Sequence, residues 1–196
     1  MERSLNQEKK IAAIRIAEFA NQDRAFAEQL GIRPNMPVRL HPVTHYVTAK
    51  VTGTTIKFVE SSKNNTVGVQ TFNSDKLDAN KPLVLCGIAA VYAKEATADN
   101  KTVATASYDK TAPAELVNGE IVLSQENRGD LVDMLLSQAF NQNTTTHNLE
   151  REFEVADMPI IKDKSSFKLE AEIPAALASG SDHFVRVELR GYTIQA

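Results

Sequence analysis

Residues 43–51 read Val-Thr-His-Tyr-Val-Thr-Ala-Lys-Val, and this stretch decides the fold class. Mostly apolar side chains at odd positions alternate with polar side chains at even positions. This two-residue period and the many β-branched residues are typical of a strand with one buried face. Gly53 interrupts the pattern, and residues 56–59 resume it. The two segments therefore predict a β-hairpin with a short turn.

The same alternation returns in the last third of the chain. Residues 149–155, 167–173 and 185–189 each place apolar side chains on one face and charged side chains on the other. This pattern is typical of a half-exposed antiparallel sheet, and charged outer positions also protect sheet edges from unwanted pairing. We expect three strands here.

The middle of the chain contains the most apolar segment, Pro82–Ala93. Its β-branched residues and Gly87 favour a central strand buried on both faces. We also expect a short strand at 67–72, an edge strand near Val103, a tight turn at Asn118-Gly119 and a short helix at 128–140, although a strand there is an alternative. About eight short strands predict a mainly β fold, an antiparallel β-sandwich or jelly roll.

The first thirty residues differ from everything that follows. Ser4 and Gln7 have capping-box spacing, and no glycine or proline occurs before Gly31 and Pro34. We therefore expect one long helix, roughly 40 Å from end to end at 1.5 Å per residue. This divides the chain into an N-terminal helical arm, residues 1–33, and a β-sandwich domain, residues 34–196.

The predicted helix carries one apolar stripe, which Lys9 and Asp23 interrupt. Two interpretations remain open: the helix packs along its own β domain, or it docks on a neighbouring subunit. For the second interpretation we name five interface residues. They are Leu5, Ile16, Phe19, Phe26 and Leu30.

Composition excludes several classes of function. A net charge of −3 over 196 residues argues against a nucleic-acid-binding surface across the whole protein. The chain has no apolar run long enough to span a membrane and no signal-peptide pattern. We expect a protein made in the cytoplasm, with its single cysteine, Cys86, buried and inert.

A search for chemistry finds no motif. His41 and His45 would share a strand face, but they would lie about 13 Å apart, too far to bind one metal ion. Asp157, next to a predicted turn, and the histidines at 45 and 183 are the residues on which an enzyme hypothesis would rest. We expect no catalytic residue, no metal site and no cofactor.

Leu149–Ala196 resembles the closing strands of bacteriophage jelly-roll virion proteins. The resemblance is carried by the segments Phe153–Ile161, Phe167–Pro174 and Phe184–Gly191. It implies a capsid or other virion subunit (minor capsid, penton, auxiliary or connector) that assembles with copies of itself or with other virion proteins. It also implies location in the virion, after synthesis in the host cytoplasm.

Two other functions compete with this one. A β-sandwich could be a binding module for a glycan, a peptide or another protein, although exposed aromatic residues that stack on sugars are few and tryptophan is absent. It could also serve as the scaffold of an enzyme. A measurement of the oligomeric state distinguishes the assembly subunit from the binding module and from the enzyme.

Overall fold

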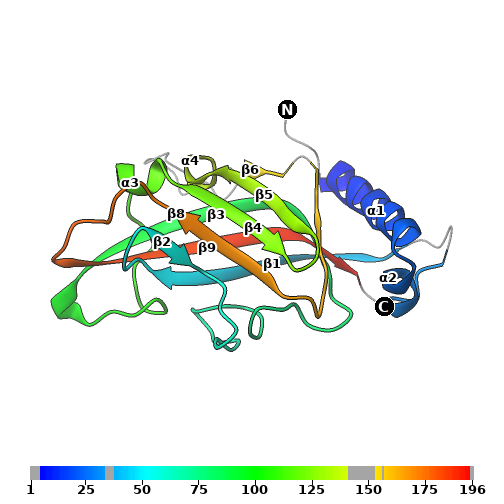
Figure 1. The fold of residues 1–196 in the computed structure, drawn as a ribbon, viewed down its shortest axis with the longest axis horizontal. Helices are drawn as coiled ribbons and strands as arrows, with labels where there is room; N and C mark the ends of the chain where they lie inside the picture. The colour runs from blue at the N-terminus through cyan, green and yellow to red at the C-terminus, as the bar shows by residue number, and fades with distance from the viewer. Residues whose placement is uncertain (1–4, 34–37, 141–152, 156, 195–196) are drawn as a thin grey trace.

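The computed structural model describes residues 5–33, 38–140, 153–155 and 157–194 (Figure 1). Its described elements follow in chain order. They are α1 (Leu5–Gln22), α2 (Arg24–Gln29), β1 (Leu40–Lys50), β2 (Thr55–Lys57), β3 (Leu83–Ala96), the 3-10 helix η1 (Thr97–Asp99), α3 (Ala114–Val117), β4 (Glu120–Gln125), β5 (Gly129–Leu135), α4 (Leu136–Ala139), β6 (Phe153–Glu154), β7 (Ile160–Ile161), β8 (Phe167–Glu172) and β9 (Ser181–Ile194).

The described strands form two antiparallel sheets, so the expected mainly β fold with an N-terminal helix is confirmed. The first sheet has the order β1-β9-β3-β6, and β7 also pairs with β3. The second sheet has the order β2-β8-β4-β5. Most neighbouring strands are distant in sequence: β1 pairs with β9, and β2 pairs with β8, whereas β4 and β5 are consecutive.

The expected hairpin between residues 43–51 and 56–59 is wrong. β1 and β2 are the predicted strands, but they belong to different sheets. The chain leaves β1 at Val51, whose N–H donates to the His183 carbonyl, and reaches the second sheet by Thr54, whose carbonyl accepts the N–H of Ile173. The short glycine-containing connection therefore carries the chain from one sheet to the other instead of closing a turn.

The main core lies between the sheets, and its largest fully buried side chains include Phe58, Phe72 and Phe167. β8 alternates buried and more exposed residues, as expected. β3 is the expected strand buried on both faces, and it lies centrally between β9 and the short strands β6 and β7. Leu83, Leu85 and Ile88 face the main core, whereas Val84 and Cys86 belong to a second apolar cluster under the helices.

β9 approaches β3 very closely beside an irregularity in their register between Leu85 and Gly87. A Cβ atom on Gly191 of β9 would lie only 1.9 Å from the carbonyl oxygen of Val84. Only glycine fits this position, which is adjacent to the second apolar cluster.

At residues 128–140 the strand alternative is confirmed for β5, and helix is limited to the single turn of α4, because Asn127 and Gly129, both with positive φ, turn the chain back along β4. Other local expectations fail. Residues 67–72 make isolated bridges rather than a strand, and residues near Val103 form turns. The Asn118-Gly119 turn ends α3 instead of joining two strands. The polar loop expected at 141–148 and the first residues of the strand expected at 149–155 lie outside the described residues; β6 is its described part.

The single long helix is also wrong, because Asp23 divides it into α1 and α2. Asp23 has extended backbone angles, and its carboxylate accepts a 3.0 Å hydrogen bond from the N–H of Phe26. It is therefore the N-cap of α2. Gly31, with a φ of 64°, ends the helical segment as expected, and Ser4 lies outside the described residues.

Candidate functional site

The candidate site is the contact between the helical arm and the first sheet. In the described structure the arm consists of residues 5–33, and it lies beside the end of the sandwich where β1 begins and β9 ends (Figure 1). The alternation along β9 explains this position. Residues such as Val187 and Leu189 face the main core, while Tyr192 and Ile194 belong to the cluster that contacts the arm.

Buried apolar residues from the arm and the sheet form what we call the arm cluster. Ala12, Ile16 and Ala20 follow one another at four-residue intervals, so they share one face of α1. Small residues at both ends let the helix approach the sheet closely, and Ile16 is completely buried between them. The whole arm cluster is Ala12, Ile16, Ala20, Phe26, Leu30, Leu40, Val84, Cys86, Met158, Ile160, Tyr192 and Ile194.

Phe19 lies at the border of the arm cluster. Its ring meets the edge of Phe26 at a centroid distance of 4.9 Å and an interplanar angle of 88°. The guanidinium carbon of Arg128 lies 4.9 Å from the Phe19 ring centroid, and the ammonium of Lys162 lies 5.4 Å away. Each such cation–π contact contributes about 0.5–1 kcal/mol at a partly exposed position.

Charged groups fix the first helix to the domain. The Arg15 guanidinium donates two hydrogen bonds, of 2.9 and 2.7 Å, to the backbone carbonyl of Asp157. Arg190 of β9 donates a 3.1 Å hydrogen bond to Glu8, a carboxylate that is only 5% exposed. Burial, together with the Glu8 carboxylate, raises the pKa of Tyr192 to about 12, so this tyrosine stays neutral.

Polar contacts also hold α2. Lys162 forms an ion pair with Asp23, and this hydrogen-bonded contact lowers the pKa of Asp23, as does the N–H of Phe26. Gln29 donates a 2.6 Å hydrogen bond to Asp163, which also accepts the backbone N–H of Asn80 at 2.7 Å. The arm is thus held by one apolar face and by polar contacts at several points along it.

The structure brings together four of the five predicted interface residues. Ile16, Phe26 and Leu30 are buried in the arm cluster, and Phe19 packs at its border. Leu5 begins α1, but its side chain lies outside the described residues. Within one chain, the first interpretation, packing of the arm along its own domain, is therefore the contact observed. Docking of the arm on a neighbour remains a prediction.

The residues of the enzyme hypothesis do not come together. His45 accepts or donates a 3.0 Å hydrogen bond with Thr71 and pairs in register with Leu189, six residues along β9 from His183. Six residues of strand span roughly 20 Å. Asp157 is exposed beside the arm, on the side of Arg15. Among the described residues, no three His, Cys, Asp or Glu side chains are arranged to hold a metal ion.

Reasoning from sequence missed the polar half of the arm contact. Glu8 and Arg15 were not among the predicted interface residues, although a carboxylate on the buried side of an amphipathic helix signals a cationic partner. The receiving residues Val84, Cys86 and Tyr192 could not be assigned, because each lies in a strand whose other face fills the main core.

No protein-family model matches the sequence, and neither a curated protein nor a solved structure matches the chain. In the described part of the chain, no helix has both the length and the hydrophobicity needed to cross a membrane.

Proposed function

We propose that this chain is a structural subunit of a bacteriophage virion, that its sandwich is a jelly roll, and that it acts by self-assembly. The observation that carries the proposal is the nested strand pairing. β1 pairs with β9, β2 with β8, β3 with β6 and β7, and β4 with β5.

In this nested order the first strand pairs with the last, and the pairs continue inward to β4 and β5. The same order results when one long antiparallel hairpin is rolled into a barrel-like sandwich. With β6 and β7 counted as two pieces of one strand, each sheet has four strands, and neighbours come alternately from the two halves of the hairpin. Eight strands in two such sheets are the description of a jelly roll. The pairing therefore supports the fold that the C-terminal segments suggested by resemblance.

Jelly rolls occur in viral capsid and lectin domains. The step from fold to function is an analogy, because one fold serves many functions. The arm contact favours the capsid alternative. It combines an apolar face with several charged contacts. The surface of the first sheet that receives the arm, called the groove below, is the same on every copy of the chain.

Self-assembly follows if arms are exchanged between copies. An arm that leaves its own groove and enters the groove of a neighbour makes the same contacts, so the exchange changes the packing free energy little. Ile16, Phe26 and Leu30 would then fill the neighbour's arm cluster, and Glu8 would meet the neighbour's Arg190. The outcome is a chain of subunits linked by their arms or a closed ring.

The pair Glu8–Arg190 provides a test for exchange. In a Glu8→Arg chain, or in an Arg190→Glu chain, like charges meet in the groove and the arm should detach. The double variant Glu8→Arg/Arg190→Glu restores the attraction in reversed order, and it controls for effects of either substitution on folding. Oligomeric state is measured by sedimentation for wild type, both single variants, the double variant and a mixture of the two singles.

We expect wild type and the double variant to be oligomers and each single variant to be a monomer. In the mixture, the arm of the Glu8→Arg chain fits only the groove of the Arg190→Glu chain, so mixed oligomers should form. A monomeric wild type at high protein concentration contradicts self-assembly. Oligomers that persist in both single variants, or a mixture that stays monomeric beside an oligomeric double variant, contradict arm exchange.

A further inference from the structure

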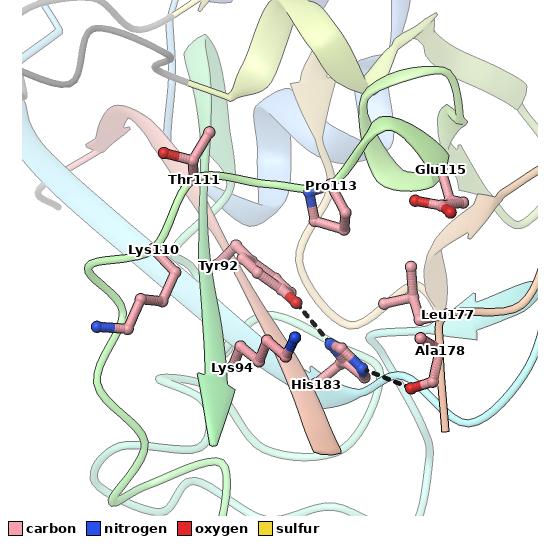
Figure 2. A pocket seen from close by; sticks show the side chains of 9 residues that line it. All are labelled: Tyr92, Lys94, Lys110, Thr111, Pro113, Glu115, Leu177, Ala178 and His183. Carbon is pink, nitrogen blue, oxygen red and sulfur yellow. Dashed lines mark hydrogen bonds between the residues drawn. The ribbon is translucent and has the colours of Figure 1, made fainter. Parts of the chain in front are cut away.

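A cavity of about 470 Å³ lies at the end of the first sheet opposite the arm, under the segments that lead into α3 and into β9 (Figure 1 and Figure 2). Tyr92 and Lys94, near the end of β3, and His183, near the start of β9, line it together with residues before and within α3. Tyr92 is eight residues of strand from Val84 in the arm cluster, or roughly 26 Å. The cavity is therefore separate from the candidate site.

Its floor is a buried pair of polar rings. Tyr92 and His183 are 3% and 6% exposed, and their rings are stacked with centroids 6.0 Å apart. His183 Nε2 lies 3.1 Å from the carbonyl of Ala178, so this nitrogen carries the proton. In the neutral imidazole, Nδ1 then accepts the hydroxyl proton of Tyr92 across 2.5 Å. The Tyr92 oxygen keeps lone pairs that can accept a further hydrogen bond.

Burial raises the pKa of Tyr92 to about 12, and the carboxylate of Glu115 adds to the effect. The hydroxyl therefore stays protonated at physiological pH. Both nitrogens of His183 are already engaged, so the imidazole holds the Tyr92 hydroxyl in one orientation. The floor presents a fixed acceptor oxygen to whatever enters the cavity.

The walls carry charges of both signs. Lys94 and Lys110 come from one side in Figure 2, and Glu115 and Leu177 from the other, with the Tyr92–His183 pair between them. Among the described residues, the side chains of Lys94 and Glu115 form no ion pair or hydrogen bond, and the Lys110 ammonium pairs with its exposed neighbour Asp109. Lys94 is exposed and Glu115 is half-buried, so both charges can be reached by a ligand at the mouth of the cavity.

We propose that this cavity binds a small molecule that carries a carboxylate together with hydrogen-bond donors, the chemistry shared by an acidic sugar and an amino acid. The ammonium group of Lys94, which points toward the Tyr92–His183 pair in Figure 2, pairs with the carboxylate. Glu115 and the Tyr92 oxygen accept hydrogen bonds from hydroxyl or ammonium groups. Pro113 and Leu177 contact the apolar body of the ligand. The volume is in the range of small-molecule sites, about 300–1,000 Å³.

The proposal does not depend on self-assembly, because the cavity and the arm occupy opposite ends of the sandwich. Binding is measured by calorimetry on the full chain with two matched pairs of probes: glucuronate against glucose, and leucine against leucine amide. Each pair differs chiefly in the carboxylate. The variants are Lys94→Met and Glu115→Gln, and the control is Lys168→Met, a change of an exposed lysine on β8 of the other sheet.

We expect glucuronate or leucine to bind with a Kd of about 1 mM or tighter, and its partner without a carboxylate to bind at least tenfold more weakly. Lys94→Met should weaken binding at least tenfold and Lys168→Met should leave it unchanged. A larger loss with Glu115→Gln for leucine than for glucuronate identifies the amino acid as the better match. Absence of binding by both carboxylates at about 10 mM, or an unchanged Kd in Lys94→Met, overturns the proposal.

Discussion

The two ends of the sandwich differ in how their polar groups are paired. At the arm end, helices α1 and α2 cover the sheet, and Glu8, Arg15 and Asp23 each have a partner on the domain. At the cavity end, the side chains of Lys94 and Glu115 line the cavity without an ion-pair partner in the described structure. The same two sheets thus provide one end that is closed by the chain itself and one that is open to a ligand.

This difference separates two kinds of role. Complementary charges around an apolar face fix the register of a macromolecular contact, because a misplaced arm leaves charges unpaired. Unpaired charges around a cavity instead attract a molecule that supplies the missing partners. This difference is the reason that we propose assembly for the arm end and small-molecule binding for the cavity end.

The largest effect that sharpens the comparison is expected from Ile16→Ala. Ile16 is fully buried at the centre of the arm cluster, so its truncation should cost about 2–5 kcal/mol of arm docking. The main core does not include Ile16, and the sandwich should therefore stay folded. Hydrogen exchange checks this: amides of α1 and α2 should lose protection, while those of β4 and β8 should keep it.

Ile14→Ala is the matched control, because Ile14 is on the same helix and 56% exposed. It should change stability by less than about 0.5 kcal/mol. Loss of protection in β4 and β8 of the Ile16→Ala variant would show that the arm contact and the sandwich unfold as one unit. The two ends could then not be treated as independent.

The sequence predicts the strands well and their partners poorly. Residues 43–51, 82–93 and 167–173 have patterns set by local burial, and all three are strands in the structure. Strand pairing depends on contacts across the whole chain. The predicted partner of β1 was the next strand, β2, but β1 pairs with β9, about 140 residues away. The sequence left helix and strand open for the segment of β5, because its apolar spacing fits a helix, and pairing with β4 makes it a strand.

The candidate site was predictable in part. The apolar stripe identified Ile16, Phe26 and Leu30, because a helix that buries one face must display this period. Asp23 appeared as an interruption of the stripe, and only the structure reveals it as a helix cap with an ionic partner. The cavity had no signal in sequence, since Tyr92 and His183 are brought together by the pairing of β3 with β9.

A smaller effect is expected at the open end from Tyr92→Phe. The substitution removes the hydroxyl and leaves Nδ1 of the buried His183 without its hydrogen-bond partner. Loss of a buried partner costs about 1–3 kcal/mol, which urea denaturation measures. Tyr108→Phe is the control, because its hydroxyl donates to the Val103 carbonyl in a loop of mostly exposed residues, and Tyr108 is only half-buried. If the two substitutions lowered the free energy of unfolding equally, the Tyr92–His183 hydrogen bond would contribute no more than the Tyr108–Val103 one.

The smallest effect concerns the charge of Asp23 at the closed end. Its pKa is lowered in the folded protein, chiefly by the hydrogen bond with Lys162 and then by the Phe26 N–H. A lowered folded-state pKa means that the stabilisation is complete above the ordinary value of 3.8 and is lost as the pH falls through the lower folded value.

Asp23→Asn keeps an acceptor for the Phe26 N–H but removes the charge. Arm docking, followed through the NMR signals of Phe26 between pH 6 and 2, should therefore be weaker in the variant at pH 6, by about 0.5–1 kcal/mol for a partly exposed pair. The two proteins should converge as the pH falls through the lowered pKa of Asp23, because the wild-type carboxyl then also becomes neutral. A difference that stays constant down to pH 2 would assign the role of Asp23 to helix capping alone, and the ion pair with Lys162 would no longer distinguish the closed end from the open one.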